Sequence, residues 1–68
     1  YLESIADYSK AIELDPNNSY LYFGRGMSYE YLNQNEESLK NLKMSLAIDP
    51  DFSLALSMVN YLENEKNR

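Results

Sequence analysis

The 68-residue sequence contains no cysteine and no histidine. Disulfides, which often reinforce folds of this size, are therefore excluded, and the soft side-chain ligands that zinc, iron and copper commonly use are missing. Catalysis also lacks its most common nucleophile and base, and no G-x-S-x-G or P-loop spacing occurs. We expect no enzymatic activity and no catalytic residues, and we expect neither a bound metal nor a cofactor.

Positive charge and long apolar runs are scarce as well. Eleven acidic residues against six basic ones give a net charge of -5, and the basic residues are dispersed, so a nucleic-acid backbone would be repelled. No apolar run approaches the roughly 18 residues that a membrane-spanning helix needs, and no signal peptide or lipidation motif is recognisable. We expect a cytoplasmic protein without nucleic-acid or membrane partners, although the chain does not begin with Met and native terminal signals can lie outside it.

Apolar residues recur at steps of three and four along the chain, which is typical of amphipathic helices. The pattern predicts helices over residues 1–14, 20–32, 35–48 and about 54–65. Turn-forming Asp-Pro segments separate the first pair and the last pair. Asn33 lies in the middle connection and is expected to adopt the left-handed conformation. No strand pattern is present, so the predicted fold class is all-α.

Polar residues at the start of the third helix predict how it is capped. Asn35 is expected to be the N-cap residue, and Glu36 and Glu37 follow in the first turn, where negative charge meets the positive end of the helix dipole. Glu36 also precedes Lys40 by four residues, in the favourable order for an intrahelical ion pair.

Two near-copies of one phrase define an internal repeat. Residues 11–16 read Ala-Ile-Glu-Leu-Asp-Pro and residues 46–50 read Leu-Ala-Ile-Asp-Pro, so that Pro16 and Pro50 are 34 residues apart. This spacing is the period of the tetratricopeptide repeat, a helix-turn-helix unit that stacks into solenoids. The chain resembles that family.

Residues 19–52 resemble one complete repeat. Gly26 matches the family's glycine, which has a physical reason, because only a residue without Cβ lets two tightly packed helices approach at their crossing. The other matching positions in this repeat are Tyr22, Arg25, Tyr29, Ser38, Leu42 and Ser45. The small-large-small arrangement of the last three is expected to form a socket for the partner helix.

The resemblance extends to both sides of this repeat. Residues 1–18 match the second half of a preceding repeat at Tyr1, Ser4, Tyr8, Ala11 and Pro16. Residues 53–68 resemble a single capping helix, because Asn60 replaces the glycine and Glu63 replaces an aromatic residue. The resemblance thus implies one domain over residues 1–68, a solenoid of four antiparallel helices made of a half repeat, a full repeat and a capping helix.

Two residues of the second helix depart from the expected pattern. Gly24 costs about 1 kcal/mol relative to alanine in a helix, and the family pattern supplies no reason for it. Arg25 takes a position often filled by leucine, and we expect its stem to pack along the core while its guanidinium reaches surface carboxylates.

The resemblance implies a protein-interaction scaffold that binds a protein or peptide on a concave face lined by the first helix of each repeat. Apolar and aromatic residues form a stripe there, as is common at interface cores. The predicted partner-binding residues are Tyr20, Phe23, Met27, Glu30, Tyr31, Leu54, Ser57 and Tyr61. Some family members grip a C-terminal carboxylate through Lys, Arg and Asn, but Phe23, Met27 and Gly24 occupy those positions here.

Two alternatives remain open. The aromatic stripe can instead be core between consecutive repeats, which would make the chain a structural segment of a larger solenoid. The first helix has no preceding partner helix in the sequence, so Ile5, Tyr8 and Ile12 would be partly uncovered and the chain could form a homodimer through them.

Overall fold

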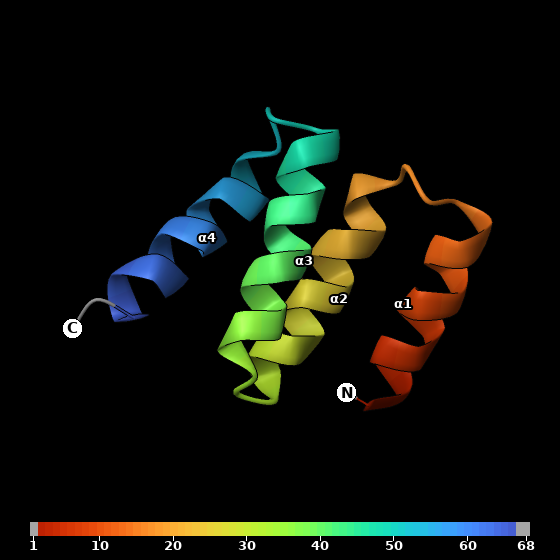
Figure 1. Ribbon diagram of the computed structural model, residues 1–68, viewed down its shortest axis with the longest axis horizontal. Coiled ribbons are helices and arrows are strands. Elements are labelled where there is room, and N and C mark those ends of the chain that lie inside the picture. The colour runs from red at the N-terminus through yellow and green to blue at the C-terminus, as the bar shows by residue number, and fades with distance from the viewer. Residues whose placement is uncertain (1, 67–68) are drawn as a thin grey trace.

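The computed structural model describes residues 2–66, except the side chain of Lys66, and consists of four α-helices (Figure 1). Their bounds are α1 Leu2–Leu14, α2 Ser19–Tyr31, α3 Asn35–Ile48 and α4 Ser53–Lys66. The all-α prediction is confirmed, and no strand occurs within the described range. Tyr1, which belongs to the repeat pattern, lies outside the described residues.

The helices lie side by side in chain order, with α1 at one end of the row and α4 at the other (Figure 1). Each helix packs against the next one along the chain, and the contact between α2 and α3 is the most extensive. The arrangement is thin, with dimensions of 37 × 27 × 13 Å. Within residues 2–66, the outer side of α1 therefore faces no other helix.

The turn predicted at Asp15 and Pro16 is present between α1 and α2, and it ends in a side-chain cap. The side-chain oxygen of Asn18 accepts a hydrogen bond of 3.0 Å from the backbone N–H of Tyr20, which satisfies a donor at the start of α2. The Asn18 amide also donates to the Asp15 carboxylate at 3.1 Å.

The connection between α2 and α3 confirms the left-handed conformation predicted for Asn33, whose φ is 60°. The N–H of Asn33 donates to the carbonyl of Glu30 at 2.9 Å, and that of Gln34 donates to Tyr29 at 3.0 Å. These two bonds form a Schellman motif.

The N-cap predicted at Asn35 is wrong. The helix itself spans Asn35–Ile48 as predicted, so Asn35 is its first residue and the cap lies one residue before it. Gln34 is the N-cap residue and makes no side-chain capping bond. Glu36 and Glu37 do lie in the first turn, as predicted, and Lys40 pairs with Glu37 at 3.5 Å.

The contact between α2 and α3 depends on Gly26. A Cβ atom at this residue would lie 3.0 Å from Cγ of Leu42 and 3.2 Å from the backbone oxygen of Ser38. Ser38, Leu42 and Ser45 all have 0% exposure, so the predicted small-large-small socket is filled by α2. Ser45 also donates to the carbonyl of Ser19 at 2.9 Å.

The main hydrophobic cluster joins α3 to α4. Buried residues of both helices form its centre, and an ion pair of 3.6 Å between Lys43 and Glu63 lies at its edge. The cluster consists of Leu39, Leu42, Val59 and Leu62, with Phe23, Leu46 and Met58 packed against it. Glu63, which replaces an aromatic residue of the repeat, is thus placed where α3 supplies its charge partner.

The contact between α1 and α2 explains Gly24. A Cβ atom there would lie 2.6 Å from the hydroxyl oxygen of Tyr8 and closer still to its ring. Glycine therefore leaves room for the ring of Tyr8, which any larger residue would displace. Ile12 is buried, which corrects the expectation that it would be partly uncovered, since it lies on the side of α1 that faces α2 rather than outward. Ile5 and Tyr8 are half-buried, as expected.

Arg25 links three helices. The prediction that its guanidinium reaches surface carboxylates is wrong. Its Nε donates to the side-chain oxygen of Asn41 at 2.6 Å, and one of its terminal nitrogens donates to the Ser9 hydroxyl at 3.1 Å. The guanidinium also lies 5.5 Å from the ring centre of Tyr22. Neutral acceptors of α1 and α3 lie closer to the guanidinium than any surface carboxylate, because Arg25 points between these helices.

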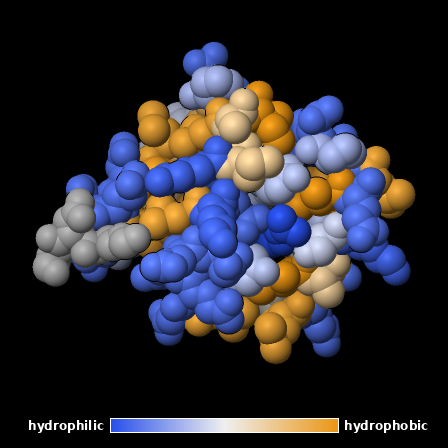
Figure 2. Space-filling view, in the orientation of Figure 1, coloured by the Kyte–Doolittle hydropathy of each residue, from blue (hydrophilic) through white to orange (hydrophobic). Residues whose placement is uncertain are grey.

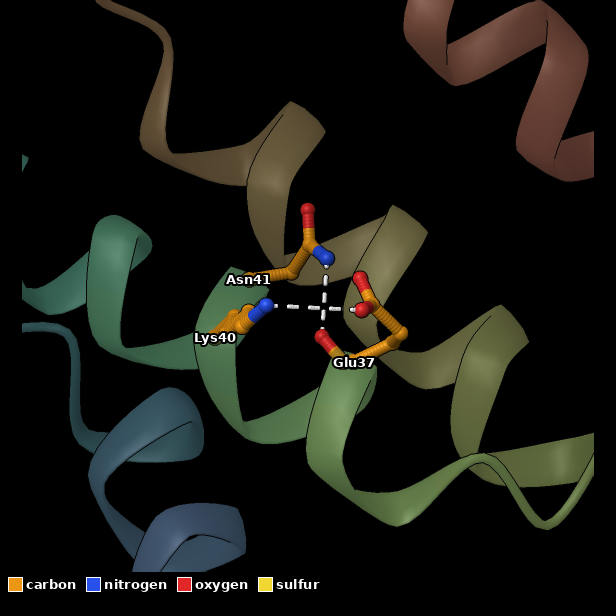
Figure 3. A network of polar contacts seen from close by, with 3 residues as sticks. All are labelled: Glu37, Lys40 and Asn41. Carbon is orange, nitrogen blue, oxygen red and sulfur yellow. Dashed lines mark hydrogen bonds and ion pairs between the residues drawn. The ribbon is translucent and has the colours of Figure 1, made fainter.

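Asn41 is itself held in position by its own helix. Its amide nitrogen donates to the backbone carbonyl of Glu37 at 2.8 Å, which leaves the amide oxygen pointing away from that carbonyl (Figure 3). Asn41 is buried and accepts from Arg25 with this oxygen. The polar contact between α2 and α3 is thus pre-oriented by the backbone of α3.

Candidate functional site

The eight predicted partner-binding residues lie on α2 and α4. Tyr20 is 68% exposed and Tyr31 is 61% exposed, and on α4 Leu54 and Tyr61 are also more than half exposed. Ser57 is exposed. Among the described residues eight large hydrophobic side chains are exposed, and four of them belong to the predicted set. We call the eight predicted residues the groove set.

The remaining members are half-buried, and Phe23 is part of the core. Its ring lies 5.0 Å from that of Phe52 and packs against the cluster between α3 and α4. Met27 and Glu30 are likewise half-buried. Phe23 therefore agrees in part with the alternative interpretation, in which the aromatic stripe belongs to the core rather than to a binding surface.

Phe52 is a residue that the sequence interpretation missed. It is buried immediately before α4, and its ring lies 4.8 Å from that of Tyr20. The tilted ring contacts of Phe52 with Tyr20 and Phe23 join the start of α4 to α2. The signal in the sequence was a large aromatic residue directly before a predicted helix, at the end of a segment that otherwise consists of turn-forming residues.

The surface chemistry of the groove set is apolar with a slight negative charge. It contains one carboxylate, that of Glu30, and no cation. The cations with described side chains are Lys10 in α1, Arg25 between the helices, and Lys40 and Lys43 in α3.

The broad face seen in the orientation of Figure 1 is of mixed character. Hydrophilic residues cover its centre and hydrophobic residues appear around them (Figure 2). This face is therefore not a continuous apolar patch.

Two pockets lie away from the groove set. One, of about 350 Å³, is lined by residues of α1 and by Leu21 of α2, and the other, of about 320 Å³, lies between α3 and α4. The first is lined by Ser4, Asp7, Tyr8, Ala11 and Leu21. The second is lined by Asn35, Glu36, Leu39, Leu62 and Glu65.

Neither a metal site nor a membrane span is found in the part of the chain that the structure describes. No group of three or more acidic side chains there could hold a metal ion. None of the described helices combines the length and the apolar character needed to cross a membrane.

Comparison with known proteins gives a match to the sequence model of the tetratricopeptide repeat over residues 7–40. The match begins within α1 and ends within α3. No solved structure gives a significant match.

Three curated proteins are similar in sequence. Protein STIP1 homolog of Dictyostelium discoideum is 38% identical over 53 residues, which is 78% of this chain and 9% of that protein. Small glutamine-rich tetratricopeptide repeat-containing protein 2 of Mycosarcoma maydis is 31% identical over 61 residues, 90% of this chain and 17% of that protein. Sperm-associated antigen 1 of Mus musculus is 31% identical over 62 residues, 91% of this chain and 7% of that protein. The chain thus spans less than a fifth of each relative's length.

Proposed function

Because the chain belongs to the tetratricopeptide repeat family, whose members are generally protein-interaction modules, we propose that its groove set binds a peptide or helix of a protein partner. The observation that carries the proposal is the exposure of Tyr20, Tyr31, Leu54 and Tyr61 on α2 and α4. Contiguous apolar side chains on a protein surface usually mark contact sites. Helical repeats bind partners on such extended surfaces.

The aromatic residues would supply most of the binding energy. Tyrosine is enriched among residues whose truncation costs 2 kcal/mol or more. Tyr20 is supported by Phe52 at 4.8 Å, so little side-chain freedom is lost when a ligand covers it. Phe23 and Met27, half-buried between the exposed tyrosines, form the floor on which a ligand side chain would rest.

The charge of the groove set indicates the kind of ligand. With Glu30 and no cation, the surface favours apolar side chains with neutral or basic flanks and disfavours an acidic peptide terminus. An amphipathic helix laid along the tyrosines would present its own apolar residues at steps of three and four.

The proposal is tested by selecting binders from a displayed library of random peptides on the 68-residue chain. The selected peptides should be apolar and neutral or basic. Tyr61→Ser should weaken their binding by tenfold or more, since a truncated hot spot costs about 2 kcal/mol. Leu56→Ser is the matched control, because Leu56 is also exposed on α4 but lies outside the groove set.

Equal losses in the two variants would show that binding does not use the groove set. Selection of peptides that depend on a C-terminal carboxylate would contradict the charge argument. Circular dichroism of both variants should show unchanged helix content, since both side chains are about half exposed.

A further inference from the structure

The guanidinium of Arg25 is a half-buried cation without an anionic partner. Within residues 2–66 its side chain contacts the amide oxygen of Asn41, the hydroxyl of Ser9 and the ring of Tyr22, and it forms no ion pair with a carboxylate. The lysines with described side chains are all exposed, so Arg25 differs from them in its burial. A charge that is partly withdrawn from water is stabilised most by an opposite charge. The position of Arg25 therefore favours an anion.

The guanidinium is held in one orientation before any ligand arrives. Its Nε donates to Asn41 at 2.6 Å and one terminal nitrogen donates to Ser9 at 3.1 Å, so α3 and α1 fix it from two sides. Asn41 is fixed in turn by its hydrogen bond of 2.8 Å to the backbone carbonyl of Glu37 (Figure 3). A guanidinium that is already oriented loses little side-chain freedom when it binds an anion.

Two hydrogen-bond donors at this position have no acceptor within the described range. The second terminal nitrogen of Arg25 donates to none of these residues. The Ser9 hydroxyl accepts from Arg25, but its own proton is not donated to any of them. Because the Ser9 oxygen lies only 3.1 Å from the guanidinium, a small group with two oxygens can contact both donors at once. The two side chains thus form a site that is complementary to an oxyanion.

The charge around the site favours a singly charged group. The adjacent helix α1 holds Glu3, Asp7 and Glu13 against Lys10, and the whole chain has a net charge of -5. A doubly charged phosphate would be repelled more strongly by these carboxylates than a singly charged group. A carboxylate carries one charge, and its two oxygens match the planar guanidinium.

This site lies on the opposite side of α2 from the groove set. Arg25 follows Tyr20 by five residues and precedes Met27 by two, and both steps lead to the opposite face of a helix. The donors come from α1 and α2, and the groove set lies on α2 and α4. The two surfaces share no residue.

We propose that Arg25 and Ser9 bind the carboxylate of an aspartate or glutamate side chain of a protein partner. One carboxylate oxygen accepts from the Ser9 hydroxyl, and the other accepts from the terminal nitrogen of Arg25 that is not bonded to Ser9. The site thus prefers an acidic residue, whereas the groove set favours neutral or basic ligands.

The probes are sodium acetate and two peptides with blocked termini, acetyl-Gly-Glu-Gly-amide and acetyl-Gly-Gln-Gly-amide. Each is titrated at constant ionic strength into the isotopically labelled 68-residue chain, and the Nε–H signal of Arg25 and the amide signal of Ser9 are recorded. Acetate and the glutamate peptide should shift both signals saturably, with dissociation constants of about 0.1 M or below, as expected for a single charge-assisted contact. The glutamine peptide should cause no such shift.

Substitutions at Ser9 test whether the carboxylate occupies this site. Ser9→Ala removes one donor and should weaken acetate binding about threefold or more. Ser9→Asp places a carboxylate of the chain itself beside Arg25, so it should abolish acetate binding. It should also lower the equilibrium constant of unfolding about fivefold relative to Ser9→Asn, which has nearly the same shape but no charge. Lys10→Gln is the matched control, because it removes an exposed cation of the same helix and should leave acetate binding unchanged.

Four results would overturn the proposal. They are shifts that grow linearly without saturation, equal acetate binding by the unchanged chain and Ser9→Asp, tighter binding of inorganic phosphate than of acetate, and tighter binding of a peptide whose only carboxylate is its C-terminus than of the blocked glutamate peptide. If Ser9→Asp unfolds the chain, equal acetate binding by Ser9→Ala and the unchanged chain overturns the proposal instead, since alanine favours the helix. Tyr61→Ser should not affect acetate binding, so this proposal and that of the groove set fail separately.

Discussion

Replacing Gly24 with alanine should destabilise the chain as it stands but stabilise a variant in which Tyr8 is leucine. A Cβ at this residue would lie 2.6 Å from the Tyr8 hydroxyl and nearer to its ring carbons. All the atoms in conflict belong to the outer half of the tyrosine ring. Leucine lacks them, so in that background the added methyl meets no obstacle that the structure shows.

The magnitudes follow from two opposing terms. Alanine in place of glycine inside a helix gains about 1 kcal/mol. Against this, overpacking a fitted contact costs about 1–3 kcal/mol. Because Tyr8 borders an open pocket and can swing outward, the lower half of that range, about 1–2 kcal/mol, applies, and the net loss should be at most about 1 kcal/mol. In the Tyr8→Leu background there is no overpacking cost, so Gly24→Ala should raise the free energy of unfolding by about 1 kcal/mol.

Urea unfolding followed by circular dichroism at 222 nm measures the four free energies of this double-mutant cycle. The coupling between the two sites should be about 1–2 kcal/mol, above the few tenths expected for independent sites. Equal stabilisation by Gly24→Ala in both backgrounds would refute the reasoning, since it would mean that Tyr8 does not lie against Gly24. A change in the slope of the free energy of unfolding against urea concentration would instead show that α1 unfolds separately from the rest.

Two further predictions concern buried polar groups, and both are measured as free energies of unfolding in urea. Ser45→Ala removes a buried hydrogen bond to Ser19 and should cost about 1 kcal/mol. Ser38→Ala is the same change on the same helix face and should be neutral or stabilising, because within the described residues the buried Ser38 hydroxyl has no hydrogen-bond partner. Arg25→Lys should cost about 1–2 kcal/mol, since one ammonium cannot reproduce two hydrogen bonds of a planar guanidinium, and should cost less than half as much in an Asn41→Ala background.

The local signals in the sequence were sufficient for the helices and their turns. Asn33 and Asn18 act within a few residues of themselves, so their left-handed and capping roles could be predicted from neighbours in sequence. Gly26 could be predicted because its requirement, close approach of two helices joined by a short turn, belongs to the repeat. The groove set stays a prediction, and the exposure of its tyrosines agrees with it.

Contacts between helices of different repeats could not be predicted in the same way. Whether Gly24 is needed depends on the size of the residue that α1 places against it, and helical spacing gives only the face of each residue. The partners of Arg25 were missed for a related reason, because Ser9 and Asn41 come from two different helices. Phe52 was missed because a residue between helices has no periodicity that would identify it as core.

The internal repeat allows one surface of the molecule to serve as a control for another. Ser4 and Ser38 are the same residue type at the same repeat position, yet Ser38 is fully buried and Ser4 is half-buried. The difference cannot come from the side chain, so it comes from the helix that covers one position and not the other within residues 2–66.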